Sequence, residues 1–386
     1  MNFGLTETQQ TIRSSARQFL AAECPMAEVR RLAETETVYD AGLWSKFAAQ
    51  GWTGIIFPEE YDGLGLGMLE MAATLEEMGR ALVPGPFIST VLLAGTLLDR
   101  AGSDQHKQKY LSAICRGEAR STVALLERSA SWDLDAVHLE ARGISDAFEL
   151  SGEKLFVPDA AIADFLLVVA RLAGDLAVFL VPAATPGLEV IATPALDITR
   201  RLYQVSFAQV VVPTENLLCR GERAREALES ALEVACLGTV AEMVGGIQSL
   251  LDLTVAYAKT RKQFGRPIGS FQAVQHQCAD MLVLLEGSRS ALYYAAWMLG
   301  ENDPGARTAV SVAKAYASEA YRDAGNKSIQ VQGGMGFTWE NDAHLYYRRA
   351  KASEIAFGDA TFHRERIAQM LIDRGLPKSR LGVAAD

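Results

Sequence analysis

The chain has few of the residues from which disulfide frameworks and metal centres are built. Its 386 residues include five cysteines, at positions 24, 115, 219, 236 and 278, and five histidines. The cysteine number is odd and no C-x-x-C pair occurs, which argues against a disulfide framework or a structural zinc site. The histidines lie apart without an H-E-x-x-H motif, so no metal site is expected. This cysteine usage is typical of the reducing cytoplasm, where we expect the protein to work.

An excess of positive charge and a long apolar N-terminal run are also missing. The chain has 37 Lys and Arg against 47 Asp and Glu, with a formal net charge of −10. Nucleic acid is therefore not expected as a partner, because phosphate backbones are bound by basic faces. The first 23 residues include Glu7, Arg13 and Arg17 and no unbroken apolar stretch. We expect neither a signal peptide nor a membrane span.

The N-terminal third follows a helical hydrophobic period. Ile12, Ala16, Phe19 and Leu20 have the three-to-four-residue spacing of a buried helix face. The Gly-rich stretch 58–67 lacks the strand-then-helix context of a phosphate loop, so it is expected to be a connecting loop. We place a helical domain at residues 1–120.

The middle third changes to short β-branched or aromatic runs separated by Gly, Pro and Asp. This pattern is typical of a small β domain, which we place at residues 121–215. The expected strands are 122–126, 148–151, 165–171, 177–181, 188–191 and 204–212.

From Glu222 the apolar spacing becomes helical again. We expect one helix to about Thr260, then helices at 271–300, 306–330 and 342–376. Four long helices with short connections make an antiparallel bundle, which we place at residues 222–386. The predicted fold class is therefore α+β, with a helical domain, a β domain and a helical bundle in that order.

A basic corner joins the first two bundle helices, in the segment YAKTRKQFGRPIGSFQA. Arg261, Lys262 and Arg266 cluster there, beside a helix that starts near Phe271. Guanidinium groups and the free amides of a helix start suit a pyrophosphate. Taken alone, the segment is more often a solvated basic corner with Phe264 packed beneath it.

A second corner, IQVQGGMGF, joins the third and fourth helices. Gly333, Gly334 and Gly336 permit a close backbone approach to a bulky ligand, and Gln330 has a side chain that both donates and accepts. Taken alone, this segment is equally consistent with a tight turn between helices.

Together the two segments resemble the acyl-CoA dehydrogenase family, whose pattern is roughly YA-x-x-R-x-Q-F-G-R-P-I-x-x-x-Q-A and then IQ-x-x-GG-x-G-F. Both occur in order, and the helical–β–helical layout extends the resemblance over nearly the whole chain. The resemblance implies an FAD-dependent oxidoreductase that dehydrogenates an acyl-CoA thioester and passes electrons to an electron-transfer flavoprotein.

The resemblance also implies which residues bind the cofactor. Those of the first corner would hold the FAD pyrophosphate and dinucleotide, and those of the second would line its adenine side. In this family they reach across a dimer interface to an FAD whose flavin ring lies in the neighbouring subunit. The implied residues are Arg261, Gln263, Phe264, Gln272, Gln330, Gly333 and Gly334.

The glutamate that serves this family as general base has no counterpart here. In the commonest branch it lies in a Y-E-G-T-type segment, which reads AFGD here, so Phe357 takes its place. In a second branch it lies 26 residues before the equivalent of Arg261, at Ala235. Glu242 lies two helical turns further on, about 10 Å away, and is too distant to substitute unaided. We therefore assign no catalytic residue to this chain.

The β domain departs from the family pattern as well. The family's T-E-P-x-A-G-S-D loop reads LERSASWD here, with only Trp132-Asp133 resembling its end. Phe156 and Pro158 stand where a tryptophan and a threonine beside the flavin are expected. Proline offers no backbone donor to the flavin edge.

The substitutions remove the base and the flavin contacts, whereas the two corners that would bind a neighbour's FAD are retained. The sequence therefore predicts the base-lacking, smaller subunit of an α2β2 acyl-CoA dehydrogenase, of the kind that acts on bulky acyl-CoAs such as steroid side chains. One alternative is a homomeric dehydrogenase, self-associated as a dimer or tetramer, with Glu242 or another carboxylate as base. A second alternative is a non-catalytic binding protein with the same fold.

Overall fold

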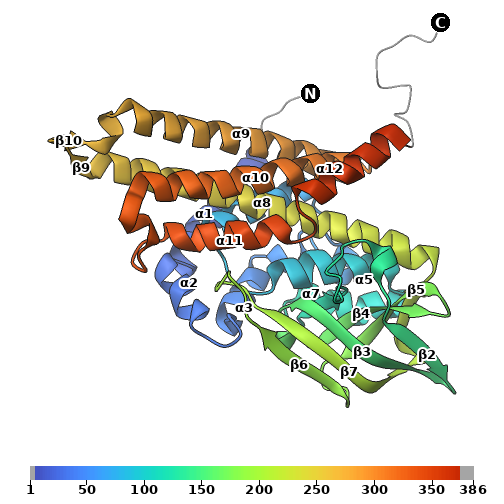
Figure 1. The fold of residues 1–386 in the computed structure, drawn as a ribbon. Helices are drawn as coiled ribbons and strands as arrows, with labels where there is room; N and C mark the ends of the chain where they lie inside the picture. The colour runs from blue at the N-terminus through green and yellow to red at the C-terminus, as the bar shows by residue number, and fades with distance from the viewer. Residues whose placement is uncertain (1–4, 374–386) are drawn as a thin grey trace, which may run out of the picture.

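The computed structural model describes residues 5–373, which form three parts in chain order (Figure 1). A helical part comes first, a β-sheet follows, and long helices close the described chain. The α+β fold class and this order of parts are confirmed. The ends of the two outer predicted domains, 1–4 and 374–386, lie outside the described residues.

Helices of the N-terminal part pack around one apolar core. Thr6 caps the first of them, because its hydroxyl accepts from the Gln9 amide while the Gln9 side chain accepts from the Thr6 amide. This helix buries Ala16 and Leu20, as the predicted spacing requires. The stretch 58–67 contains one short helical turn, Glu59–Tyr61. The larger helical elements are α1 (Glu7–Glu23), α2 (Met26–Ala33), α3 (Ala41–Ala49), α4 (Met68–Arg80), η3 (Phe87–Gly95), α5 (Thr96–Ala101), α6 (Asp104–His106), η4 (Lys107–Leu111) and α7 (Ser112–Cys115).

The middle part is one eight-stranded sheet in the order β6-β7-β3-β2-β4-β5-β8, with β1 paired to β4. Six of its strands coincide with the predicted runs. β2 was not predicted, because four of its five residues are exposed or polar, and β8 lies just past the predicted boundary at 215. The strands are β1 (Ser121–Ala124), β2 (Glu140–Ile144), β3 (Ala147–Pro158), β4 (Phe165–Leu172), β5 (Asp175–Pro182), β6 (Leu188–Thr193), β7 (Leu202–Pro213) and β8 (Leu217–Arg220).

Three long helices form the bundle: α8 (Glu222–Thr260), α9 (Gln272–Gly300) and α10 (Ala306–Gln332). They run up, down and up, because short corners connect them. α8 is long and apolar enough to cross a membrane, but 94% of its most apolar window is buried inside the protein. It is therefore the central helix of the bundle, with α9, α10 and α4 packed around it.

The last predicted helix, 342–376, is wrong as a single element. The chain forms α11 (Ala343–Ile355) and α12 (Ala360–Ala368), followed by one wider helical turn, Gln369–Asp373. Phe357 and Gly358 both have positive φ, at 60° and 97°, a conformation that ends a right-handed helix. The Asp359 side chain then accepts from the Phe362 amide and caps α12.

Glycines bring α4 and α8 into backbone contact. A Cβ added at Gly79 would lie 2.1 Å from the carbonyl oxygen of Glu242, and one at Gly245 would lie 1.8 Å from that of Glu76. Neither position accepts a side chain without separating the helices. This contact fixes the N-terminal part directly against the bundle.

A strap between β6 and β7, residues 194–201, joins all three parts. In Figure 1 it is the yellow-green loop that passes between the sheet, α2 and α11. Arg201 in the strap donates to the carbonyls of Ala33, Thr35 and Glu36 at the end of α2. Arg349 on α11 donates to Asp197 in the strap. The strap therefore holds the sheet against both helical parts.

Candidate cofactor corner and the closed base position

The corner between α8 and α9 is a tight hairpin at one tip of the bundle (Figure 1). β9 (Lys262–Gln263) pairs with β10 (Arg266–Pro267). The two turn residues, Phe264 and Gly265, both have positive φ, at 53° and 77°, as a two-residue hairpin requires. Phenylalanine is strained in this conformation, and its side chain is 91% exposed. An exposed aromatic held in this way is suited to contact with another molecule.

Positive charge on this hairpin has no counter-charge within the described chain. Arg261, Lys262 and Arg266 are exposed, and none of them forms an ion pair with a carboxylate of residues 5–373. Arg266 lies 4.3 Å over the ring of Phe271. Phe271 precedes α9 without a side-chain cap, so the first amides of a 29-residue helix face the same corner. The corner can therefore receive an anion from outside the chain.

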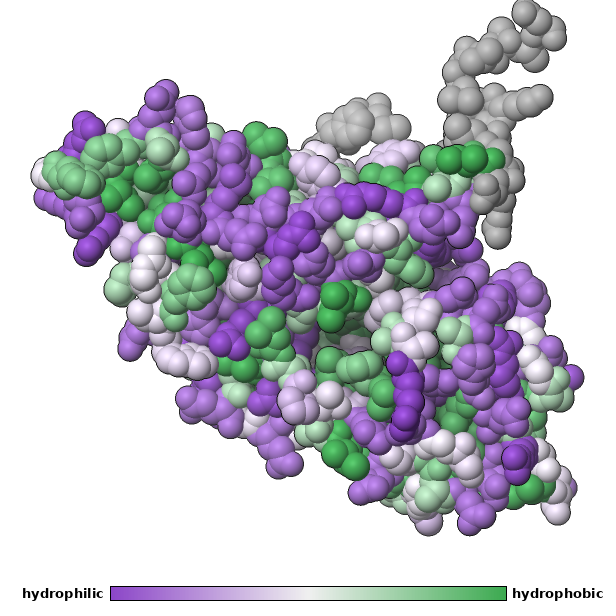
Figure 2. Space-filling model, in the orientation of Figure 1, coloured by the Kyte–Doolittle hydropathy of each residue, from purple (hydrophilic) through white to green (hydrophobic). Residues whose placement is uncertain are grey.

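The remaining first-corner residues point outward as well. Gln263 is exposed and its side-chain amide donates to the carbonyl of Lys262. Gln272 begins α9 and is also exposed. Figure 2 shows apolar side chains gathered at this tip among polar ones. Arg261, Gln263, Phe264 and Gln272 thus share one open surface.

The corner between α10 and α11 lies at the same end of the bundle (Figure 1). Gly333 has φ 60° and ψ −139°, a conformation that favours glycine. A Cβ added at Gly333 or Gly334 would meet nothing within 4 Å, whereas one at Gly336 would lie 3.0 Å from Ile329. Gly336 therefore serves internal packing, while Gly333 and Gly334 leave open surface beside the exposed Gln330.

Buried hydroxyl groups hold the ends of α8 and α10 together. Thr254 on α8 donates to Ser328 on α10 over 2.8 Å, and Gln332 donates to the same hydroxyl over 3.0 Å. This contact keeps the two corners at one end of the bundle. No hydrogen bond between the described residues joins Arg261 to Gln330, so the seven predicted residues form an open surface rather than a closed pocket.

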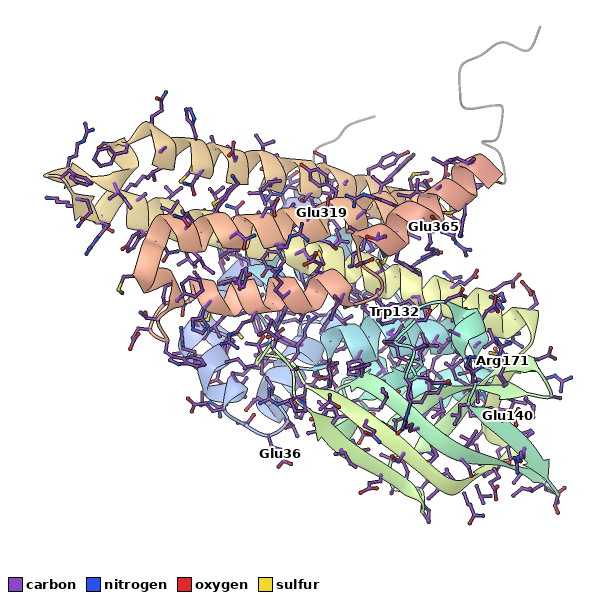
Figure 3. All side chains as sticks on the ribbon, in the orientation of Figure 1. Glu36, Trp132, Glu140, Arg171, Glu319 and Glu365 are labelled. Carbon is purple, nitrogen blue, oxygen red and sulfur yellow. The ribbon has the colours of Figure 1, made fainter. Side chains whose placement is uncertain are left out.

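The position of the expected base is filled by hydrocarbon. Phe357 lies in the turn between α11 and α12, and its ring packs on Trp132, with centroids 5.0 Å apart and planes at 37°. Ala235 on α8 is fully buried. Figure 3 shows Trp132 between the sheet and the bundle helices. Neither of the two known base positions carries a group that accepts a proton.

A buried lysine, which the sequence reasoning missed, holds the turn that carries Phe357. Lys314 on α10 is fully buried and donates to the carbonyls of Glu354 and Gly358, over 3.0 and 2.8 Å. Burial lowers its pKa to about 8. His363 Nε2 donates to the carbonyl of Phe357 over 3.0 Å. The sequence did contain a signal for this residue, because Lys314 lies among alanines on the apolar face of the predicted helix 306–330.

Glu242, the alternative base, is buried and already paired. It is 4% exposed and forms an ion pair with Arg200 of the strap. Its carboxylate is therefore bound within the chain and does not face an open surface. Glu233, nine residues earlier on α8, is paired with Arg307.

The flavin side of the β domain is also altered. A register shift in β3 between Lys154 and Val157 places Phe156 at φ 54°, with its side chain 38% exposed. Pro158 pairs with Leu202 at the end of the strand. Phe156 and Pro158 offer no side-chain hydrogen bond to a flavin, so neither residue makes the polar contact that the resemblance implies at this position.

A hollow of about 520 Å³ opens beside Trp132, between α8, α10 and α12. Its arginines are neutralised from within the chain. Arg307 pairs with Glu229 over 2.8 Å and Arg225 pairs with Asp135. The charges needed to bind an external phosphate are therefore occupied.

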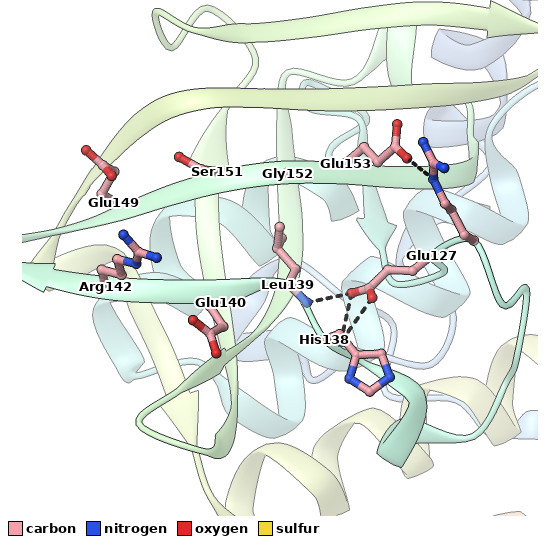
Figure 4. A pocket seen from close by; sticks show the side chains of 10 residues that line it. Glu127, His138, Leu139, Glu140, Arg142, Glu149, Ser151, Gly152 and Glu153 are labelled. Atoms are coloured by element: carbon pink, nitrogen blue, oxygen red, sulfur yellow. Dashed lines mark hydrogen bonds and ion pairs between the residues drawn. The ribbon is translucent and has the colours of Figure 1, made fainter.

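A second hollow, of about 490 Å³, lies on the outer face of the sheet (Figure 4). Glu127 occupies its inner wall and accepts from the amides of His138 and Leu139 and from Lys154. Glu140, Glu149 and Glu153 lie around its rim. Within residues 5–373 no group of His, Cys, Asp and Glu could hold a metal ion.

Comparison with known proteins decides the family. A model described as "Acyl-CoA dehydrogenase, N-terminal domain" matches residues 6–118, and one described as "Acyl-CoA dehydrogenase, C-terminal domain" matches residues 225–372. The chain belongs to the acyl-CoA dehydrogenase family. Members of this family are FAD-dependent oxidoreductases.

Individual relatives span nearly the whole chain. The probable acyl-CoA dehydrogenase YngJ of Bacillus subtilis is 32% identical and covers 96% of this chain and 100% of its own. A chain of the ChsE4-ChsE5 complex from Mycobacterium tuberculosis superposes with a TM-score of 0.87 at 31% identity, covering 96% of this chain and 99% of that one. PigA with FAD and proline superposes with a TM-score of 0.90 at 26% identity, covering 97% and 100%.

Proposed function

We propose that this acyl-CoA dehydrogenase chain is the base-lacking subunit of a heteromeric enzyme. Its residues bind the dinucleotide part of an FAD whose flavin ring lies in a partner subunit. One observation carries the proposal. The cationic corner at Arg261 is open and without internal counter-charge, while the base position at Phe357 is packed shut against Trp132. Random loss of function would be expected to damage both.

The chain's own residues hold the dinucleotide half of the cofactor. Arg261 binds the pyrophosphate together with the free amides at the start of α9, and Phe264 covers the cofactor from the hairpin tip. Gln330, Gly333 and Gly334 leave room for the adenine side. FAD, when bound, accepts the hydride that leaves the acyl group. The partner subunit supplies the binding site for the flavin ring, the general base and the binding site for the acyl-CoA thioester.

The comparisons support a heteromer without requiring one. ChsE4 and ChsE5 form a complex, and a chain of that complex covers almost the full length of this one. We place the assembly in the cytoplasm and infer that an electron-transfer flavoprotein accepts its electrons.

The homomeric alternative requires Glu242 to act as base. Its position weighs against this role, because the carboxylate is 4% exposed and already bound to Arg200. The non-catalytic alternative gives no role to the unpaired cations of the hairpin.

The test compares the lone chain with the chain co-expressed with base-bearing family members from the same organism. We measure FAD per chain and flavin bleaching after addition of acyl-CoA. The lone chain should hold little FAD and show no bleaching. The pair should hold one FAD per two chains, and replacing the partner's catalytic glutamate by glutamine should lower turnover by about 10²–10⁴.

Glu242→Gln in this chain is the matched control and should leave turnover of the pair nearly unchanged. Bleaching of the lone chain by acyl-CoA, abolished by Glu242→Gln, would instead establish the homomeric enzyme.

A further inference from the structure

A loop segment of the β domain, residues 128–133, lies between the sheet and the bundle. Four of its six residues are exposed, and Ser131 and Trp132 are half-buried. Its hydrogen bonds are local, such as the one that the Ala130 amide donates to the carbonyl of Glu127. No hydrogen bond or ion pair between the described residues joins this segment to the bundle helices. We call residues 128–133 the flap.

The chain is firmly held just before the flap. The Glu127 carboxylate accepts from the amides of His138 and Leu139, over 3.0 and 2.9 Å. It also accepts from the buried ammonium group of Lys154 over 2.7 Å. This end of the flap is therefore fixed to two strands of the sheet.

The chain is held again just after the flap. Leu134 is 4% exposed. Arg171 on β4 donates to the carbonyl of Leu134 over 3.2 Å and to that of Val137 over 3.0 Å. A short segment with few buried contacts between two fixed ends opens at a lower free energy than the sheet that carries it. The flap therefore has the geometry of a hinged unit.

Trp132 is the flap residue that packs on the core of the bundle. Its ring lies on Phe357, with centroids 5.0 Å apart. Phe357 belongs to the turn whose carbonyls are held by Lys314 and His363. The contact therefore joins a side chain on a hinged segment to a side chain on a fixed one.

The Trp132 ring also forms part of the wall of the hollow of about 520 Å³. Leu232 and Phe362 line the same hollow, whereas Phe357 and Ala235 do not. Figure 3 shows Trp132 at this place between the sheet and the bundle. The ring thus stands between the hollow and the base position at Phe357.

We propose that the flap is a gate, in which Trp132 closes the passage from the hollow to the base position. When the flap swings away from the bundle, the hollow extends to the Phe357 ring. One aromatic contact stabilises the closed state only modestly, so the open state is a minor population of the same protein. The gate is a property of this chain alone and does not depend on the proposed heteromer.

The test uses trypsin, because the Arg128 side chain in the flap is 86% exposed. Cleavage after Arg128 follows the open population when opening and closing are fast. Trp132→Ala and Phe357→Ala should each raise its rate by about 2–10-fold, the range expected for a lost aromatic pair. The double variant should be cleaved no faster than either single one. Trp132→Phe, which keeps an aromatic contact, should stay near the wild type.

Cleavage after Arg142 is the internal control, because this exposed residue lies on β2 of the same sheet. Its rate should be the same in every variant. Equal acceleration after Arg128 and Arg142 would show that the whole sheet opens, which overturns the hinge. A wild-type rate after Arg128 in Trp132→Ala overturns the contact as the closing element.

A crystal structure of Trp132→Ala tests the passage directly. The hollow should extend to the Phe357 ring, while the bonds of Arg171 and Lys154 at the two ends of the flap remain. A hollow that still ends short of Phe357 would show that another group separates the two, and the gate would be wrong.

Discussion

Trp132 and Phe357 lie face to face at a tilt of 37°, with ring centroids 5.0 Å apart. One comes from the loop after β1 and the other from the turn between α11 and α12. Lys314 and His363 hold the carbonyls of that turn, so the position of Phe357 is fixed from behind. The loss of the glutamate is therefore accompanied by repacking, and the structure offers no vacant place to a restored carboxylate.

Phe357→Glu should not convert the lone chain into an acyl-CoA dehydrogenase. The substitution removes an aromatic pair worth about 0.5–1.5 kcal/mol and places a carboxylate against the Trp132 ring. We expect a lower free energy of unfolding in urea and no flavin bleaching by acyl-CoA. Phe357→Leu, which keeps an apolar contact, should retain more stability than Phe357→Glu. Bleaching by the lone Phe357→Glu protein would show that the Trp132 contact is no barrier.

The Arg349–Asp197 pair should be costly to break from one side. Both side chains are 2% exposed, and removal of one partner of a buried pair leaves an uncompensated charge that costs about 3–5 kcal/mol. Arg349→Met should therefore destabilise the protein strongly. The double variant Arg349→Met with Asp197→Leu should recover part of the loss. Urea unfolding measures both, and a double variant no better than the single one would contradict the pairing.

Hydrophobic period predicted most of the fold, because long elements repeat their apolar spacing many times. The helix ending at Thr260 and the six strands have this property. The break at Phe357 does not, because a positive φ leaves no mark in an apolar pattern when the residue is not glycine. The strand Glu140–Ile144 was not predicted either, because its exposed residues show no alternation of apolar and polar side chains.

The candidate site was predicted from residue identity rather than from geometry. Arg261 and Gln330 were located by motif, and the structure adds that both are exposed at one end of the bundle. Their roles toward FAD stay predictions. The contact between Trp132 and Phe357 and the buried Lys314 depend on tertiary packing, so the sequence pattern alone could not predict them.

Arg261→Ala should weaken FAD retention by the assembled protein. A charge-assisted hydrogen bond contributes about 1.5–3 kcal/mol, which corresponds to roughly 10–150-fold in affinity. Arg261→Lys should lose less, because it keeps the charge but not the planar fork. The dissociation constant of FAD, from titration of the apoprotein, measures both. Arg142→Ala on the exposed β2 strand is the control. If it weakens FAD binding as much as Arg261→Ala does, Arg261 has no specific role in binding the cofactor.

Asp159 should make stability fall as pH rises through the weakly acidic range. Its carboxylate lies at the junction of the three parts and accepts from the Ser89 hydroxyl over 2.6 Å. Burial raises its pKa to about 6, while Arg200 and Arg349 lower it and Glu242 raises it. The folded state therefore holds a proton that the unfolded state releases near its ordinary pKa, about 4.

The sign of this effect follows from proton linkage. Between pH 4 and pH 6 the folded state binds more protons through Asp159 than the unfolded state does, so this group's contribution to stability declines with rising pH. Above pH 6 the decline is complete, at roughly 3 kcal/mol for a shift of about two units. Asp159→Asn keeps an acceptor for Ser89 and removes the titration. The free energy of unfolding of Asp159→Asn minus that of the wild type should therefore grow from pH 4 to pH 7, as measured in urea at each pH. A difference that stays constant over this range would show that Asp159 is ionised in the folded protein throughout.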